Sequence, residues 1–113
     1  MKKDALIFIK HVLEYIEKIE VNLKGANKKV FLKDENLHDA TIRRLEIIGE
    51  AIKNVPLSFR KKYPQIEWKL IAGFRDKLIH HYFGVDNEKV WGVIKDELPI
   101  LKEKIKFILD SES

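Results

Sequence analysis

One arginine stands in the middle of an apolar helix face. At 100° per residue, Arg75 falls among five apolar residues that share a face of one predicted helix: Trp68, Ile71, Phe74, Leu78 and Tyr82. A guanidinium that is buried without a partner costs several kcal/mol. We therefore expect Arg75 to pair with a carboxylate of the preceding helix, such as Glu46 or Glu50, to line a wet cleft, or to lie at an interface.

Two histidines and a tyrosine follow shortly after this arginine. His80 carries an imidazole, which titrates at about pH 6.5 when unperturbed and can serve as a base or an acid. A structural role explains His80 and His81 equally well, because the helix dipole favours a histidine at a helix C-terminus. Tyr82 can likewise be explained as the last aromatic residue of the apolar stripe. The residue types alone leave these alternatives open.

Helical periodicity runs through nearly the whole chain and defines the elements that must position these residues. Apolar residues recur at three- and four-residue steps, and no strand-like alternation is visible. The pattern predicts a single all-α domain, residues 1–113, folded as an up-and-down bundle of the four-helix type. The four predicted helices cover about residues 4–23, residues 34 or 36–54, residues 66 or 67–79, and the chain from a cap at Asp86 onward.

Glycine and proline mark the expected breaks between and within these helices. Residues 24–33 are predicted as a connector, and Pro56 and Pro64 bracket a second one that can hold a short turn of helix. Gly84 is expected to end the third helix. Pro99 interrupts the apolar pattern of the fourth helix and is expected to kink that helix rather than end it.

Two features of the predicted helices indicate close packing. Gly49 lies inside the second helix, where it costs about 1 kcal/mol against alanine, so another backbone is expected to approach it. The first helix carries two adjacent apolar stripes, which predicts packing on two sides. Either this helix lies in the middle of the bundle, or one of its sides is a subunit interface.

The composition excludes several classes of protein. The chain has 113 residues, a hydrophobic fraction of 45% and no cysteine. These values exclude a multidomain enzyme, a disulfide framework, a thiolate metal site and a cysteine nucleophile. No targeting segment or membrane span is visible, so we expect a cytoplasmic protein. The 22 basic and 18 acidic residues give a net charge of +4, which permits an acidic partner such as RNA without requiring one.

The segment from Arg75 to Tyr82 resembles a known family motif. Its arginine, four intervening residues, histidine, one further residue and tyrosine are similar to the motif of the HepT-like ribonuclease toxins of the HEPN superfamily. Asp76 also fits the polar residue that follows the arginine in that superfamily. The resemblance covers essentially the whole chain, including residues 44–51, 63–68 and 82–86 and the kink at residues 98–99.

The resemblance implies a metal-independent endoribonuclease without a cofactor. Family members act as homodimers in which the motifs of both subunits face one cleft. By this resemblance Arg75 binds phosphate and stabilises the transition state, and His80 supplies base or acid catalysis, while Asp76 supports the site. On a continuous helix His80 would lie about 140° from Arg75. Either the helix loosens before His80, or the site is completed across the dimer.

The resemblance also implies regulation within a toxin–antitoxin system. The antitoxin of this family is a minimal nucleotidyltransferase, usually called MntA, which adds AMP groups to the motif tyrosine. Tyr82 is therefore the expected site of AMPylation, and adenylates placed there would bring negative charge to the phosphate site. A non-enzymatic helical partner of such a nucleotidyltransferase is the alternative function.

Two basic clusters are candidates for contacts with the RNA backbone. The same lysines and arginine could equally serve only to keep the surface solvated. The seven residues are Lys24, Lys28, Lys29, Lys33, Arg60, Lys61 and Lys62.

Overall fold

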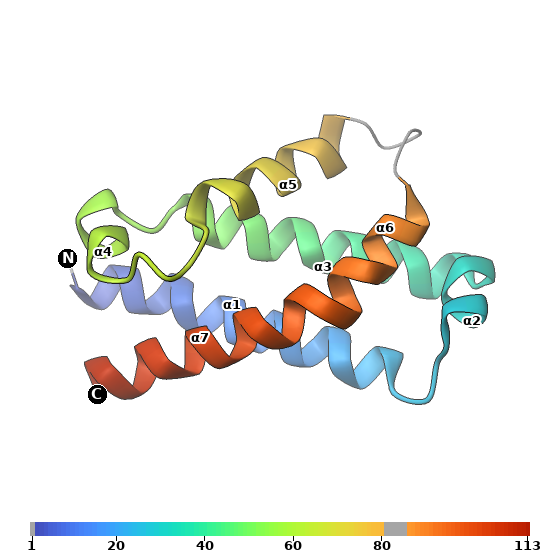
Figure 1. Ribbon diagram of the computed structural model, residues 1–113, viewed down its shortest axis with the longest axis horizontal. Coiled ribbons are helices and arrows are strands. Elements are labelled where there is room, and N and C mark those ends of the chain that lie inside the picture. The colour runs from blue at the N-terminus through green and yellow to red at the C-terminus, as the bar shows by residue number, and fades with distance from the viewer. Residues whose placement is uncertain (1, 81–85) are drawn as a thin grey trace.

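The computed structural model describes residues 2–80 and 86–113, and this part of the chain is helical without any β-strand (Figure 1). The bundle is made of long rods, which are α1, α3, α5 and the succession α6–η2–α7. The short helix α2 joins α1 to α3, and the short helix α4 joins α3 to α5. The predicted all-α bundle of the four-helix type is confirmed. The bounds are α1 Lys2–Leu23, α2 Lys28–Lys33, α3 Glu35–Lys53, α4 Leu57–Lys62, α5 Trp68–His80, α6 Asn87–Gly92, the π-helical η2 Val93–Glu97 and α7 Leu98–Glu112.

Short polar side chains cap the start of three helices. The side chains of Asn27, Asp34 and Asp86 accept hydrogen bonds from backbone N–H groups in the first turns of α2, α3 and α6. The predicted cap at Asp86 is thereby confirmed. The prediction of a plain connector over residues 24–33 is wrong in part, because its second half forms α2. The cap at Asn27 and the fully buried ring of Phe31 account for this short helix.

The expected interruption near Pro99 takes the form of a π-helical turn. Proline has no N–H to donate, so the regular ladder of α-helical hydrogen bonds is broken at this point. The N–H of Leu98 instead donates to the carbonyl of Val93, five residues back. The helix then continues as α7, so the pattern is interrupted rather than ended. The predicted break at Gly84 lies outside the described residues.

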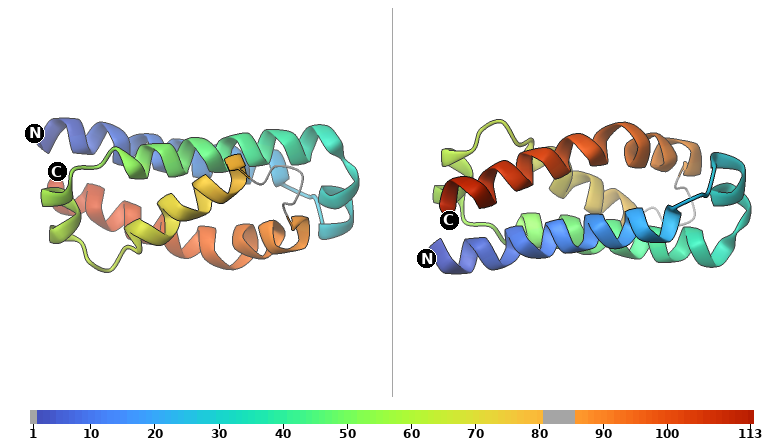
Figure 2. Two further views of the ribbon diagram at one scale, coloured as in Figure 1. Left: turned by 90° about the horizontal axis from the view of Figure 1, so that it is seen from above. Right: turned by 90° about the horizontal axis from the view of Figure 1, so that it is seen from below.

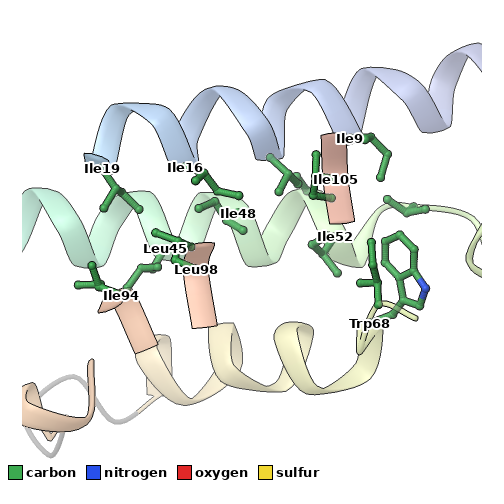
Figure 3. Packing of buried hydrophobic residues seen from close by; sticks show 14 of the residues in the cluster. Ile9, Ile16, Ile19, Leu45, Ile48, Ile52, Trp68, Ile94, Leu98 and Ile105 are labelled. Atoms are coloured by element: carbon green, nitrogen blue, oxygen red, sulfur yellow. The ribbon is translucent and has the colours of Figure 1, made fainter. Parts of the chain in front are cut away.

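The first helix lies between two others. α1 packs against α3 on one side and against α7 on the other, and α3 also packs against α5 (Figure 2). The predicted packing of α1 on two sides is thereby confirmed, and Phe8 and Tyr15 of its second stripe remain half-buried. In the part of the chain that is described, no helix is long and apolar enough to cross a membrane. Figure 3 shows the core between these helices, with labelled side chains from Ile9, Ile16, Ile19, Leu45, Ile48, Ile52, Trp68, Ile94, Leu98 and Ile105.

Candidate functional site

Arg75 of α5 is held between two carboxylates. Its Nη2 atom lies 2.7 Å from Oε2 of Glu50, on α3, and its Nη1 atom lies 3.0 Å from Oδ1 of Asp76. The expected pairing with a carboxylate of the preceding helix is therefore confirmed, and Glu50 rather than Glu46 is the partner. The arginine side chain is 22% exposed, so the pair lies at the edge of the core rather than inside it.

A glycine on α3 allows this pairing. A Cβ atom on Gly49 would lie only 2.2 Å from the Cβ of Arg75 and 3.4 Å from its Cα. Any residue with a side chain would therefore push α5 away from α3 at this crossing. The close approach that Gly49 predicts from the sequence is confirmed, and the group that approaches is the arginine itself.

Each of the two carboxylates has a further partner, and the partner of Asp76 joins α3 to α5. Asp76 also accepts from Nζ of Lys53 at 3.5 Å, and Glu50 accepts from Nδ2 of Asn54 at 3.5 Å. The hydrogen bond from Arg75 lowers the pKa of Asp76 below its ordinary value, and the charge of Lys53 lowers it further. Asp76 is therefore ionised at neutral pH and neutralises part of the charge of the arginine.

One donor of the arginine is unused. The Nε atom of Arg75 is buried and has no hydrogen-bond partner within residues 2–80 and 86–113. Both terminal nitrogens of the fork are occupied by carboxylates, and a phosphate could reach the fork only by displacing one of them. Each carboxylate holds the arginine through one contact, and the side chain of Glu50 is 51% exposed while that of Asp76 is 43% exposed.

A groove of about 370 Å³ runs over the outer face of α3 beside this arginine; we call it the Arg75 groove. It combines apolar and charged side chains, and Arg43 pairs with Glu46 at 3.5 Å along its wall. Several of these residues were not singled out from the sequence, although the spacing 43, 46, 47, 50 and 54 places them on one helix face. The lining residues are Phe8, His11, Arg43, Glu46, Ile47, Glu50, Ala51, Asn54 and Arg75.

The backbone of α5 remains helical through His80, the last residue of the helix. A loosening of the helix before His80, one of the two expected alternatives, is therefore not observed. His80 and Arg75 keep the backbone positions of a regular helix, about 140° apart around its axis. His81 and Tyr82 lie outside the described residues.

The two predicted basic clusters differ in how their side chains are used. Arg60 donates to the backbone carbonyls of residues 52, 53 and 55 and so caps the C-terminal end of α3. Lys62 pairs with Glu112 at 2.9 Å, and Lys28 pairs with Glu88 at 3.2 Å. The other four are exposed and have no carboxylate partner in the described part of the chain: Lys24, Lys29, Lys33 and Lys61.

No metal-binding cluster is present in the described ranges. Within residues 2–80 and 86–113, no three His, Cys, Asp or Glu side chains are grouped so that they could hold a metal ion.

Comparison with known proteins gives a consistent family assignment. The family model described as "Ribonuclease HepT-like" matches residues 12–108. The chain is 50% identical over 97% of its length to "Gamma-glutamylcyclotransferase and putative RNase MJ0434" of Methanocaldococcus jannaschii, and it spans half the length of that protein. No solved structure gives a significant match.

Two relatives are close to this chain in length. The chain is 46% identical over 93% of its length to "Putative RNase TTE0752" of Caldanaerobacter subterraneus subsp. tengcongensis, of which it covers 94%. It is 42% identical over 94% of its length to "Probable ribonuclease HepT" of Thermococcus cleftensis, of which it covers 96%. With the family model, these similarities show that the chain belongs to the HepT-like ribonuclease family.

Proposed function

We propose that this protein is the ribonuclease toxin of a cytoplasmic HepT/MntA-like type II toxin–antitoxin system and that it cleaves RNA without a metal ion. Arg75 is the observation that supports this proposal most directly. The crossing of α3 and α5 at Gly49 holds its guanidinium at the edge of the Arg75 groove, partly exposed and oriented by carboxylates. Once a phosphodiester displaces one of these carboxylates, the planar fork of the arginine is in place to bind it.

The reaction is a transesterification within the RNA. The 2′-oxygen of the ribose attacks the adjacent phosphorus, the bond from phosphorus to the 5′-oxygen breaks, and a 2′,3′-cyclic phosphate forms. One group accepts the proton of the 2′-hydroxyl and another protonates the departing 5′-oxygen. We assign these proton transfers to His80, and we assign stabilisation of the phosphorane charge to Arg75, with Asp76 orienting the arginine.

The position of His80 on α5 favours a site shared by two subunits. The backbone position of His80 lies about 140° around the axis of α5 from that of Arg75, so the two positions are on different faces of one regular helix. In a two-fold dimer each subunit contributes both residues, and two imidazoles can take the roles of base and acid. The Arg75 groove, with its half-buried Phe8 and Ile47, is a surface that the second copy can cover.

We further propose that Tyr82 is the target of an MntA-like antitoxin. It follows His80 by two positions, so AMP groups on its hydroxyl would bring phosphate charge to the site that Arg75 serves. Mass spectrometry of the protein co-expressed with its nucleotidyltransferase should show adenylate mass increments on Tyr82. An unmodified tyrosine under these conditions would refute the assignment.

A cleavage assay in EDTA tests the central proposal. We expect the purified protein to cleave RNA in EDTA, and we expect Arg75→Ala and His80→Ala each to abolish cleavage. Arg43→Ala is a matched control, because Arg43 lines the same groove but is exposed and pairs only with Glu46. Cleavage that requires a metal, or that survives in the Arg75 and His80 variants, would refute the enzymatic proposal.

The same assay separates the alternative function. In a non-enzymatic partner of a nucleotidyltransferase, the contacts of Arg75 with Glu50 and Asp76 would serve only to hold α3 and α5 together. The protein would then leave RNA intact, and Arg75→Ala would weaken folding or complex formation instead. The occupation of both terminal nitrogens by carboxylates is the feature that favours this alternative.

A further inference from the structure

A second groove lies on the other side of α1, where α1 ends beside the α6–η2–α7 rod. We call it the Trp91 groove, and its volume is about 310 Å³. Apolar and charged side chains both line it, and the charged ones are those of Glu20, Lys24 and Lys95. The lining residues are Ile19, Glu20, Leu23, Lys24, Gly25, Ala26, Trp91, Ile94, Lys95, Leu98 and Pro99.

The indole of Trp91 forms a flat aromatic surface in this groove. The ring of Phe31 packs against it at a centroid distance of 5.3 Å and an interplanar angle of 36°. Nζ of Lys95 lies 5.3 Å from the centroid of the same indole. The indole thus packs against an aromatic ring of the core, and the ammonium of Lys95 lies over it.

Two lysines of the groove have no carboxylate partner in the described part of the chain, while its glutamate is already paired. The carboxylate of Glu20 is already bound to Nζ of Lys102 at 2.7 Å. Lys24 and Lys95 have no carboxylate partner within residues 2–80 and 86–113, in contrast to Lys18 and Lys28, which pair with glutamates. The groove therefore has a net attraction for an anion beside an aromatic face.

The π-helical turn shapes this side of the groove. Lys95 lies within η2, the π-helical turn that precedes Pro99. The wider turn therefore determines the position of the Lys95 side chain around the helix axis. Such π-helical turns are frequent at functional sites. Trp91 lies on α6, the helix that follows α5 and His80 in the chain, and Figure 1 shows α6, α2 and the end of α1 at one end of the bundle.

We propose that the Trp91 groove binds one nucleotide of a single-stranded RNA. Its base takes the place over the indole of Trp91 that the ammonium of Lys95 holds in the free protein, and its phosphates contact Lys24 and Lys95. Stacking on an aromatic ring combined with lysines along the backbone is the usual way in which proteins hold single-stranded nucleic acid. This inference rests on the proposed function only in taking RNA as the ligand. It adds a contact outside the Arg75 groove.

Binding of an RNA that cannot be cleaved tests the two lysines. The probe is a short fluorescein-labelled 2′-O-methyl oligouridylate, which has no free 2′-hydroxyl to attack the phosphorus. We expect the double variant Lys24→Gln/Lys95→Gln to bind it about tenfold more weakly at low salt. The slope of log affinity against log salt should fall by about 1.4, because each phosphate contact to a single strand contributes about 0.7.

The matched control removes two charges from the adjoining helices α1 and α7. Lys10 on α1 and Lys106 on α7 are exposed, lie outside the groove and have no carboxylate partner in the described ranges. Lys10→Gln/Lys106→Gln should keep the salt slope within a few tenths of the wild-type value. Equal losses in the two double variants, or no loss in either, would overturn the proposal.

Intrinsic fluorescence tests the stacking. The chain has two tryptophans, and Trp68 is buried in the core, so a stacked base should quench Trp91 alone. Trp91→Phe keeps an aromatic ring against Phe31. This variant should bind the oligouridylate but lose the quenching seen in the wild-type protein. Quenching that persists in Trp91→Phe, or that is absent from the wild type, would contradict the proposal.

Cleavage of a dinucleotide separates this inference from the proposed function. A dinucleotide such as UpA has one phosphodiester, and that phosphodiester would occupy the site around Arg75. Its cleavage should be unchanged in Lys24→Gln/Lys95→Gln and abolished in Arg75→Ala. If no RNA is cleaved but the oligouridylate still quenches Trp91, the proposed ribonuclease function is refuted and RNA binding in the Trp91 groove is supported. If RNA is cleaved but Trp91 is not quenched, the ribonuclease function is supported and binding in the Trp91 groove is refuted.

Discussion

The side chain of Arg75 begins in the space that a side chain on Gly49 would need. A Cβ on Gly49 would lie 2.2 Å from Cβ and 2.7 Å from Cγ of the arginine. The next residue on α3, Glu50, contacts the guanidinium of the same arginine at 2.7 Å. The glycine therefore fixes both how closely α3 and α5 cross and which carboxylate the arginine meets.

Gly49→Ala should destabilise the protein although alanine is the better helix former. Alanine gains about 1 kcal/mol in helix propensity, but overpacking of a tight contact costs about 1–3 kcal/mol. Because the contact is with backbone-proximal atoms of Arg75, α5 must move to relieve it. Urea unfolding followed by circular dichroism should give a lower free energy of unfolding, and RNA cleavage should fall with the displacement of the arginine.

Gly73→Ala is the matched control on α5. A Cβ at Gly73 would meet no atom within 4 Å, so this variant should gain about 0.5–1 kcal/mol of stability. If Gly49→Ala were as stable as Gly73→Ala, α5 would have room to shift, and the tight crossing would not be needed for folding.

Glu50→Gln should lower the KM of RNA cleavage. The substitution keeps the shape of the side chain and removes the charge that competes with phosphate for the arginine, so substrate should bind more tightly. The kcat should change less than KM, because Asp76 keeps its contact with Nη1 of Arg75 and still orients the guanidinium. Steady-state cleavage of a fluorogenic RNA in EDTA measures both constants.

Glu46→Gln is the comparison for this prediction. Glu46 lies on the same face of α3 and lines the same groove, but it pairs with Arg43 instead of Arg75. Its substitution should leave both kinetic constants within about twofold of wild type. An unchanged KM in Glu50→Gln would show that Glu50 does not compete with phosphate for Arg75.

Much of the fold could be predicted from local patterns. Caps such as Asp34 and Asp86, and the apolar steps along each helix, depend on residues within a few positions of one another. The helix α2 was missed because its stability comes from outside its own six residues, through the burial of Phe31 against the rings of His38 and Trp91. Tertiary contacts of this kind leave no local pattern.

The site could be predicted only in part for a related reason. Arg75 is conspicuous because it breaks an apolar stripe, and that single anomaly predicts a carboxylate partner. The choice of Glu50 over Glu46 depends on the crossing angle and register of α3 and α5, which periodicity does not specify. Arg60 could not be assigned from the sequence, because it begins a run of three basic residues, which is typical of a solvated surface. In the structure Arg60 caps the end of α3.

Arg60→Ala should destabilise the protein by about 1–3 kcal/mol. The guanidinium donates three hydrogen bonds at 3.0–3.1 Å, to the carbonyls of Ile52 and Lys53 at the end of α3 and to that of Val55 just beyond it. The carbonyl of Ile52 also accepts from the N–H of Val55, so the loss falls mainly on the carbonyls of Lys53 and Val55. Lys61→Ala is the control, because Lys61 is exposed and has no carboxylate partner in the described residues. Thermal unfolding should separate the two variants, and equal melting temperatures would refute the capping role.

The contact between Tyr63 and Glu112 should make stability depend on alkaline pH. The hydroxyl of Tyr63 donates to the carboxylate of Glu112, near the end of α7. Burial, the hydrogen bond to Glu112 and the negative charge of that residue raise the pKa of Tyr63 from 10.0 to about 12. In the unfolded chain the tyrosine ionises at its ordinary pKa, while in the folded protein it stays neutral for about two further pH units.

The sign of the effect follows from this order of ionisation. Below pH 10 the contribution of Tyr63 to stability is fully present. As the pH rises from 10 towards 12, only the unfolded state loses the proton, so the free energy of unfolding falls. Tyr63→Phe lacks the hydroxyl, so it should be less stable than wild type at pH 9 and should approach wild type as the pH rises.

Urea unfolding at a series of pH values tests this convergence. The difference in unfolding free energy between wild type and Tyr63→Phe should be largest below pH 10 and should shrink between pH 10 and pH 12. Tyr15→Phe is measured beside it as the removal of a hydroxyl elsewhere in the protein, since Tyr15 lies on α1 and contacts Lys18 instead of a carboxylate. A Tyr63→Phe difference that stayed constant across the series would mean that Tyr63 ionises equally in the folded and unfolded states. The contact with Glu112 would then not be coupled to the ionisation of the tyrosine.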